Sequence, residues 1–218
     1  MGKIKIAGCG SSGRNILNRL IEGKIDFEQI EFYLINSDAA SLKKSKIKNK
    51  ILIGDGLGCA CSIKRAKQYL EQANNEIRNM LTDTDLLILT TGMGGGMGTA
   101  AVCEIAKIAK EQNIPTIAAV TTPFTFEGLA RITNAENGIK ELKEYTNTIF
   151  VFKNDNIFNY INEKEDTSCE KLFNFIDSVM EEIINSIITT IKNKNNIDIN
   201  DLKILIEKSS NIIILKKV

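Results

Sequence analysis

Short apolar runs alternate with longer helix-forming stretches over the first two thirds of the chain. Because Gly, Asn, Asp or Pro bounds each apolar run, we predict strands that are buried on both faces. This alternation predicts an α/β fold with three layers, in which helices cover both faces of a mainly parallel sheet. The predicted strands are Lys3–Ala7, Ile30–Ile35, Leu86–Thr90, Thr116–Val120 and Thr148–Phe152, and the predicted helices between them are Asn15–Ile21, Arg65–Leu81, Thr99–Gln112 and Glu127–Lys143.

The last third of the chain has a helical period instead. Apolar residues recur there at spacings of three and four, which predicts one amphipathic helix from about Ser168 to Lys192, roughly 35 Å long at 1.5 Å per residue. After a polar break we expect a short helix near Asp201–Lys208 and a strand at Ile212–Leu215. This strand would have few partners of its own, so its edge invites pairing with another chain. The apolar positions of the long helix are Leu172, Ile176, Val179, Met180, Ile183, Ile187 and Ile191.

Composition excludes several classes of chemistry. The 218 residues include 28 Lys and Arg and 27 Asp and Glu, and a net charge of +1 indicates neither a nucleic-acid partner nor a membrane partner. The apolar segment that opens the chain is too short for a membrane segment, so we predict none there. Histidine is absent, which excludes Ser-His and Cys-His catalysis and His-ligated zinc within this chain. We predict no metal site in the protein itself. Five cysteines without a C-x-x-C pair indicate reduced thiols and a cytoplasmic protein; they are Cys9, Cys59, Cys61, Cys103 and Cys169.

A first glycine motif follows the first predicted strand. Residues 8–13 read Gly-Cys-Gly-Ser-Ser-Gly, which fits G-x-G-x-x-G between a strand and a helix. Such glycines permit a tight turn and let phosphate oxygens approach backbone N–H groups at a helix start. On this motif alone, an NAD(P) or FAD site, another phosphate ligand and a structural turn all remain open. An NAD(P)-dependent oxidoreductase usually has an acidic residue at the end of the second strand, where this chain has Ile35.

A second glycine motif follows the strand at Leu86–Thr90. Residues 92–99 read Gly-Met-Gly-Gly-Gly-Met-Gly-Thr, and four glycines in the first five positions exceed what a structural turn requires. Such a run can present several N–H donors to an anion, with the Thr99 hydroxyl at the helix start. No Gly-Lys-Ser/Thr follows, so the motif is not a Walker A loop. Two such loops at one edge of a sheet predict a site for a polyphosphate.

Several motifs, in the same order along the chain, resemble FtsZ, the bacterial tubulin-homologue family of cell division. Residues Gly94–Ala100 resemble the family's GGGTGTG loop, and Thr122–Gly128 followed by Arg131 resembles a second family segment. The similarity extends from Lys3 to about Lys208. It implies a Rossmann-like sheet of the tubulin/FtsZ GTPase-domain type followed by a long central helix, with GTP or GDP as the ligand and Mg²⁺ with its phosphates.

The resemblance also implies a set of nucleotide-binding residues. Asn154 and Asp177 would contact guanine, and Phe173 would stack on the base, although Phe175 competes for that role. From the residues alone, Phe173 could instead belong to the core, and Asn36 or Asp38 could simply cap a helix. The full set is Gly10, Ser11, Gly13, Asn15, Asn36, Asp38, Gly56, Gly58, Gly92, Gly94, Gly95, Gly96, Met97, Gly98, Thr99, Pro123, Glu127, Arg131, Asn154, Phe173 and Asp177.

Two aspartates after the long helix carry the implied catalysis. Asp198 and Asp201 lie three residues apart at a predicted helix start, where carboxylates commonly act as caps. The resemblance implies that these two side chains enter the nucleotide site of the next subunit and polarise the attacking water. Phosphoryl transfer requires a positioned water and compensated phosphate charge, so such a mechanism needs no histidine.

The sequence departs from the family pattern at several points. Met97 replaces the threonine in the middle of the signature loop, Ala100 replaces its last glycine, and Cys59–Ile63 replaces a Gly-Ala-Asn-Pro type segment. We expect weaker γ-phosphate sensing or slow hydrolysis. The predicted organisation is a nucleotide-binding domain at 1–165, the long helix at 166–194, and the catalytic aspartates with the start of a truncated second domain at 195–218.

Two functional hypotheses follow from the resemblance. In the first, the chain is a cytoplasmic, FtsZ-like protein at the division site that self-associates head-to-tail and hydrolyses GTP at the subunit interface. In the second, it is a degenerate nucleotide-binding subunit that caps or modulates filaments of a complete relative. A Rossmann oxidoreductase using NAD(P) is a third, weaker alternative that rests on residues 8–13 alone.

Overall fold

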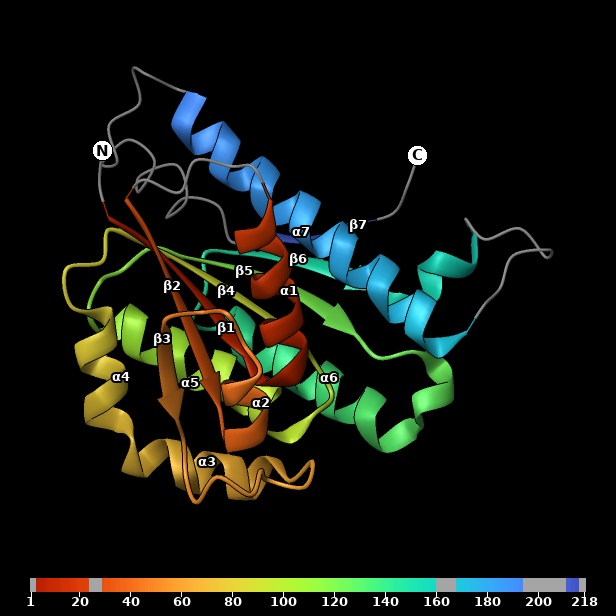
Figure 1. Ribbon diagram of the computed structural model, residues 1–218, viewed down its shortest axis with the longest axis horizontal. Coiled ribbons are helices and arrows are strands. Elements are labelled where there is room, and N and C mark those ends of the chain that lie inside the picture. The colour runs from red at the N-terminus through yellow and green to blue at the C-terminus, as the bar shows by residue number, and fades with distance from the viewer. Residues whose placement is uncertain (1–2, 24–28, 160–167, 194–210, 216–218) are drawn as a thin grey trace.

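A computed structural model of the chain describes residues 3–23, 29–159, 168–193 and 211–215. Its centre is a seven-stranded sheet in which every neighbouring pair is parallel, with the order β3-β2-β1-β4-β5-β6-β7 (Figure 1). The predicted parallel α/β fold is therefore confirmed. The strands are β1 (Ile4–Cys9), β2 (Ile30–Asn36), β3 (Asn49–Leu52), β4 (Leu86–Gly92), β5 (Thr116–Thr122), β6 (Thr148–Lys153) and β7 (Asn211–Leu215).

Helices cover both faces of this sheet. One face carries α3, α4, α5 and α6, and its core includes Leu70, Ile77 and Ile105. The other face carries α1, α2 and α7, and its core includes Leu17 and Met180; Figure 1 shows α7 crossing this face beside α1. The helices are α1 (Gly10–Glu22), α2 (Ala39–Lys43), α3 (Ile63–Gln72), α4 (Asn74–Leu81), α5 (Gly96–Glu111), α6 (Leu129–Lys143) and α7 (Cys169–Asn193), with the short 3₁₀ helices η1 (Thr125–Glu127) and η2 (Asn154–Asn159).

The strand order places a crevice between β1 and β4. From β1 the chain moves outward through β2 to β3, and it then returns to the other side of β1 to form β4. Consequently the helix after β1 covers one face and the helix after β4 covers the opposite face. The two connections diverge at the carboxyl ends of these strands, and such a switch point is where ligands bind in open α/β sheets. Both glycine motifs lie there.

The long helix is confirmed, but its buried stripe differs from the predicted one. The stripe runs through Leu172, Ile176, Met180, Ile184 and Ile188, all at a spacing of four residues. The predicted positions at 179, 183, 187 and 191 are only partly buried along its side. Among the described residues, no helix is both long and apolar enough to cross a membrane.

Four parts of the fold differ from the sequence expectations. The short elements β3 and α2 were not predicted, and the single helix expected at Arg65–Leu81 is two helices, α3 and α4, that meet at Ala73. Strand β7 joins the sheet by pairing with β6 over five residues, a partner that was not predicted, and as the last strand of the sheet it has the predicted edge position. The helix expected near Asp201–Lys208 lies outside the described residues.

Candidate functional site

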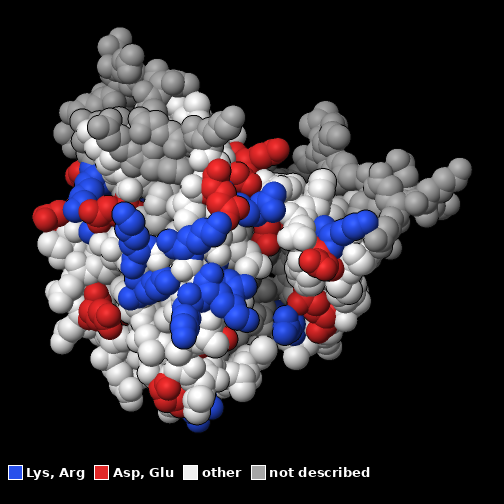
Figure 2. Space-filling view, in the orientation of Figure 1, with Lys and Arg blue, Asp and Glu red and all other residues white. Residues whose placement is uncertain are grey.

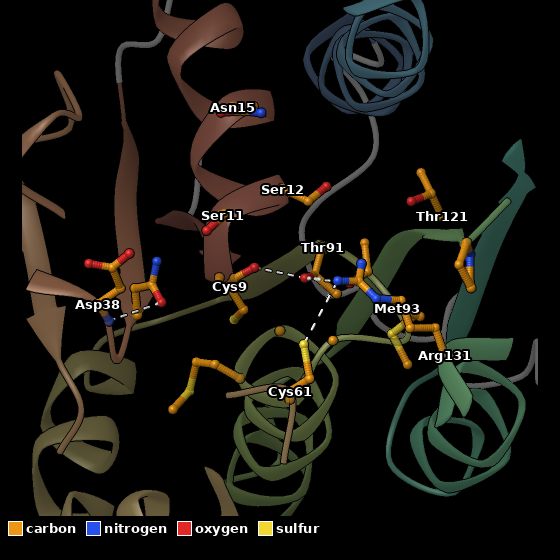
Figure 3. Close-up of a pocket in the computed structure, with 18 of the residues that line it drawn as sticks. Cys9, Ser11, Ser12, Asn15, Asp38, Cys61, Thr91, Met93, Thr121 and Arg131 are labelled. Atoms are coloured by element: carbon orange, nitrogen blue, oxygen red, sulfur yellow. Dashed lines mark hydrogen bonds between the residues drawn. The ribbon is translucent and has the colours of Figure 1, made fainter. Parts of the chain in front are cut away.

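A pocket of about 490 Å³ occupies the crevice at the carboxyl edge of the sheet. Figure 3 shows Ser11, Ser12 and Asn15 on the first turns of α1, with Cys61 and Arg131 facing them from other segments. Most of the predicted nucleotide-binding residues meet here, although they come from segments as far apart as α1 and α7. Those that line the pocket are Gly10, Ser11, Asn15, Asn36, Asp38, Gly58, Gly92, Gly95, Gly96, Met97, Gly98, Pro123, Glu127, Arg131, Asn154, Phe173 and Asp177.

The first glycine loop is built by close packing of α1 on the sheet. A Cβ atom added to Gly13 would lie 2.7 Å from the carbonyl carbon of Gly8 and 3.0 Å from the carbonyl oxygen of Thr90. Gly10 has a φ of +70°, which favours glycine, and it starts α1 directly after β1. The N-terminal backbone of α1 consequently stands at the pocket wall. The Thr91 hydroxyl ties this loop to the second one by donating to the Cys9 carbonyl at 2.7 Å.

The second glycine loop contains one glycine that protein packing does not explain. Gly94 has a φ of +101°, and Cβ atoms on Gly96 and Gly98 would approach protein atoms within 2.7 and 2.4 Å. Gly95, by contrast, has a φ of −78°, which any residue adopts, and a Cβ there would meet no described atom within 4 Å. Its missing side chain leaves the pocket open beside the start of α5. This position therefore fits a ligand that approaches the backbone closely.

Four predicted site residues do not line the pocket. Gly13 is buried by the packing of α1, and Gly56, with a φ of +85°, forms a turn whose carbonyl accepts the Ala39 N–H at 3.0 Å. Thr99 accepts the Gly94 N–H at 2.9 Å, so the two residues satisfy each other behind the pocket wall. Gly94 and Thr99 thus stabilise the shape of the second glycine loop without lining the pocket.

The pocket also holds buried polar groups without a protein partner. Within the described part of the chain, no group bonds to Asn36 Nδ2 or to Asn154 Oδ1, and both side chains are at least 96% buried. The other amide atom of Asn36 accepts the N–H groups of Ser37 at 2.8 Å and of Asp38 at 3.3 Å. A buried polar atom left unpaired costs about 1–3 kcal/mol. These two atoms therefore fit a polar ligand that pairs with them.

Asp177, on α7, is a buried carboxyl group facing this pocket with 7% of its surface exposed. Burial raises its pKa to about 6, because a low-dielectric environment disfavours the charged form. A hydrogen bond with the Asn15 side chain and the positive charges of Arg19 and Arg14 oppose the shift. A hydrogen-bond donor from a ligand would stabilise the carboxylate further.

Phe173, which lines the pocket, belongs to an aromatic cluster. Buried Phe124 stacks on Phe126 with ring centroids 4.7 Å apart, and it contacts Phe158 at 5.7 Å and Phe173 at 5.4 Å. Phe173 lines the pocket and remains 40% exposed, whereas Phe175 is not among the lining residues. Of the two candidate rings, Phe173 is the one placed to meet a ligand.

Asp38 and Met97 both line the pocket, and each also has a structural role. Asp38 does cap α2, since its carboxylate accepts the N–H groups of Ala40 at 2.9 Å and Ser41 at 3.1 Å. Met97 is only 4% exposed and belongs to the core between the sheet and α3 to α6. The methionine thus replaces the expected hydroxyl without filling the pocket with its side chain.

Arg131 links three parts of the pocket wall. Its guanidinium donates to the Glu127 carboxylate at 2.8 Å and lies 3.8 Å from the Cys61 sulfur, while the other oxygen of Glu127 accepts the Phe124 N–H at 2.9 Å. This network fixes the segment after β5 against the Cys59–Ser62 turn. Cys61, Glu127 and Arg131 all line the same pocket.

Several lining residues were not predicted. Thr91 and Thr121 could have been found, because each is a polar residue at or near the carboxyl end of a buried strand, where the predicted site lies. Cys9 ends β1 and carries the same signal, whereas Cys59 and Cys61 follow no buried strand. The unpredicted lining residues are Cys9, Ser12, Ser37, Cys59, Ala60, Cys61, Thr91, Met93, Thr121 and Ile176. The catalytic candidates Asp198 and Asp201 lie outside the described residues.

Comparison with known proteins gives one family. Residues 3–162 match the Tubulin/FtsZ family, GTPase domain. The cell division protein FtsZ of Aquifex aeolicus (strain VF5) is 34% identical over 212 residues, which cover 94% of this chain and 57% of that protein. FtsZ of Buchnera aphidicola subsp. Baizongia pistaciae (strain Bp) is 32% identical over 206 residues, which cover 92% of this chain and 52% of that protein.

Solved structures agree with this result. An empty FtsZ dimer from M. jannaschii superposes with a TM-score of 0.87 at 31% identity, covering 95% of this chain and 61% of that one. CetZ from Methanosaeta thermophila, at 18% identity and a TM-score of 0.80, shares the fold. The chain spans between about half and three fifths of the length of its FtsZ relatives. It belongs to the Tubulin/FtsZ family, with residues 3–162 corresponding to the GTPase domain.

Proposed function

We propose that the chain binds a guanine nucleotide in this pocket and hydrolyses GTP where one copy meets the next, as a cytoplasmic cytoskeletal protein of cell division. The observation that carries the proposal is the convergence of two glycine loops on a pocket in which Gly95 leaves an open approach to the backbone. The family match displaces the NAD(P) oxidoreductase alternative, which rested on the first motif alone.

The phosphates would occupy the end of the pocket between α1 and α5. Both helices are longer than three turns and start at the pocket wall, with Gly10 and Ser11 in α1 and Gly96 in α5. Backbone N–H groups and the positive ends of the helix dipoles there favour phosphate oxygens. No basic side chain of a Walker A loop is needed for this arrangement.

A magnesium ion would be held mainly by the nucleotide itself. Among the described residues there is no group of three or more His, Cys, Asp or Glu that could enclose a metal. Mg²⁺ commonly keeps several waters and binds through substrate phosphates with one or two protein oxygens. Asp38 lines the pocket, and its Oδ2, which does not take part in the cap of α2, could contribute one. The ion would neutralise charge on the phosphates.

The base would occupy the end formed by η2 and α7. Guanine offers N–H donors at N1 and N2, whereas adenine has an acceptor at N1. The unpaired Asn154 Oδ1 and the Asp177 carboxylate are both acceptors, so they fit guanine better than adenine. Phe173 would stack on the ring.

Hydrolysis would depend on a neighbouring copy. We assign Asp198 and Asp201 to the activation of the attacking water from the next subunit, on the family resemblance of residues 196–202. The M. jannaschii relative is described as a dimer, which supports self-association of the family. A site completed by two copies predicts turnover that depends on protein concentration.

Nucleotide titration tests this function directly. Fluorescent GTP and GDP analogues should bind, the ATP analogue should bind more weakly, and NADH should not bind. Specific GTP turnover should rise with protein concentration, and Asp201→Ala should abolish turnover while leaving GDP affinity unchanged. Full turnover by a demonstrated monomer, unaffected by Asp201→Ala, would exclude the interface mechanism.

A second candidate is a nucleotide-binding subunit with little hydrolysis of its own. It is favoured by Met97, which places a buried apolar side chain where the family pattern has a threonine hydroxyl. In this case the purified chain would bind GTP but form filaments only with a complete FtsZ-like relative. Negative-stain microscopy of the pure chain with GTP separates the two candidates, because filaments formed by the chain alone argue against the second.

A further inference from the structure

A dense group of lysines lies outside the nucleotide pocket. Residues 43–50 read Lys-Lys-Ser-Lys-Ile-Lys-Asn-Lys, and there is no acidic residue between Asp38 and Asp55. We call the side chains of Lys43, Lys44, Lys46, Lys48 and Lys50 the lysine surface. None of the five lines the pocket.

The fold presents all five lysines to solvent. The segment runs from the end of α2 into β3, and the buried side chains of Leu42, Ser45 and Ile47 fix it to the protein. The lysines between these anchors are exposed. Figure 2 shows basic side chains gathered in the middle of this face, over α2 and the connection to β3. The segment is therefore ordered by its buried residues and displays its charges outward.

Most of this charge is not neutralised by the protein. Lys46 pairs with Glu22 at 2.7 Å, and both side chains remain more than half exposed. Lys50 donates to the Ser45 carbonyl at 2.8 Å and keeps its charge. Within the described parts of the chain, no carboxylate pairs with Lys43, Lys44 or Lys48. The net charge of +1 for the whole chain does not reveal this local excess of positive charge, because it does not show where the charged residues lie.

The chemistry of the surface favours one class of anionic partner. Protein interfaces are depleted in lysine and enriched in arginine and aromatic residues, and residues 43–50 contain no arginine or aromatic residue. Sequence-reading and single-strand-binding sites for nucleic acids use the same two residue types for bidentate pairing and stacking. A phospholipid surface needs neither, because mobile headgroups can arrange themselves around compact, flexible ammonium groups.

We propose that the lysine surface docks the protein peripherally on a bilayer that contains anionic phospholipids. The ammonium groups of Lys43, Lys44 and Lys48, which have no described acidic partner, contact the headgroup phosphates, while Lys46 and Lys50 add to the attractive field. The contact inserts no helix, in keeping with the lack of a membrane-crossing helix among the described residues. The pocket and the surface share no residue, so the contact uses no side chain of the nucleotide site.

Vesicle sedimentation of the full chain tests this proposal. The protein should co-sediment with vesicles of phosphatidylcholine and phosphatidylglycerol, but not with phosphatidylcholine alone, and added NaCl should release it. Each lysine near an anionic surface contributes roughly a fivefold factor to partitioning, so Lys43→Gln/Lys44→Gln/Lys48→Gln should lower it on the order of 100-fold. The corresponding triple Arg variant should keep binding, since it keeps the charge.

A matched variant controls for total charge. Lys64, Lys140 and Lys143 are exposed on α3 and α6, in the layer on the other side of the sheet. Changing these three to Gln also takes the net charge from +1 to −2, yet it should reduce vesicle binding by no more than a few fold. Equal losses in the two Gln variants would overturn the assignment to this surface. Thermal unfolding should be the same for all variants.

Competition assays identify the partner class. Duplex DNA and poly-glutamate are offered to the wild-type chain and to the triple Gln variant at the same ionic strength. Weak binding of both polymers compared with anionic vesicles supports the proposal. Binding of either polymer that exceeds vesicle binding and is lost in the variant would overturn it in favour of a nucleic-acid or acidic-protein partner. Sedimentation that needs no vesicles but still depends on these lysines would likewise overturn it in favour of a second copy of the chain.

Discussion

The two glycine loops of the crevice look alike in sequence but owe their glycines to different causes. In the first loop, Gly8 and Gly13 are required by the close approach of α1 to the sheet, since a Cβ on either would lie 2.7 Å from backbone of the other. In the second loop, Gly95 has an ordinary backbone conformation and open space where a side chain would project. A glycine motif therefore indicates a ligand only at positions where neither packing nor backbone conformation demands glycine.

The largest expected effect tests the packing role of the first loop. Gly13→Ala places a methyl group against the Gly8 backbone and the Thr90 carbonyl, which cannot move as a flexible side chain would. We expect the free energy of unfolding to fall by about 3 kcal/mol. Urea denaturation measures the change. Ser11→Ala, two residues earlier on the exposed side of α1, serves as the control and should change stability by less than about 0.5 kcal/mol.

The next prediction concerns Asp177, which makes a hydrogen bond with Asn15 of α1 at the pocket. Because its folded-state pKa of about 6 exceeds the ordinary value of 3.8, the folded protein binds the proton more tightly than the unfolded chain does. Its contribution to stability is thus fully present below about pH 4 and is lost as pH rises through about 6, at a cost on the order of 3 kcal/mol. Asp177→Asn removes this loss, so the nucleotide-free variant should be more stable than wild type at neutral pH.

Urea unfolding between about pH 4 and pH 8 measures this difference, which should grow with pH. The same substitution should weaken GDP binding, because the amide replaces a carboxylate that we propose accepts hydrogen bonds from guanine. If Asp177 serves ligand binding rather than folding, the Asn variant should have a higher free energy of unfolding and a lower affinity for GDP than the wild type. Lower stability of the variant at neutral pH would show that Asp177 serves the fold instead.

A smaller effect is expected at Gly95, and it tests the ligand role of the second loop. Gly95→Ala adds a methyl group that meets no described protein atom, so the free energy of unfolding should change by less than about 1 kcal/mol. Affinity for GDP should nevertheless fall about tenfold, because the methyl group keeps the phosphates away from the backbone. Calorimetric titration gives the affinity. An unchanged affinity would mean that the ligand does not approach this position.

Much of the fold could be predicted because its central strands are buried on both faces. The apolar runs at β1, β4 and β5 needed no further information, and each of these three strands continues two residues beyond its predicted end. The edge strand β3, with the sequence Asn-Lys-Ile-Leu, buries only Ile51 and carries no such run. The pairing of β7 with β6 could not be predicted either, because it depends on where the chain returns in space.

The position of the candidate site could be predicted from the sequence, but the separate roles of its glycines could not. The glycine runs indicated two phosphate-binding loops, and the pocket confirms that both reach the same crevice. The sequence does not show that Gly13 packs a helix while Gly95 faces open space, because that distinction depends on contacts between distant segments. For the same reason it did not identify Cys61, which lines the pocket where its backbone packs against Gly96 and its sulfur lies 3.8 Å from the Arg131 guanidinium.

The smallest expected effect tests how the second loop keeps its shape. The Thr99 hydroxyl accepts the Gly94 N–H at 2.9 Å, and Gly94 holds a φ of +101°. Thr99→Val keeps the side-chain shape and leaves a buried N–H unpaired, so stability should fall by about 1 kcal/mol. Thr99→Ser loses only the methyl group and keeps the acceptor. Amide hydrogen exchange at Gly94 should therefore quicken in the Val variant and stay slow in the Ser variant; equal exchange in both would mean that the hydroxyl does not hold this loop.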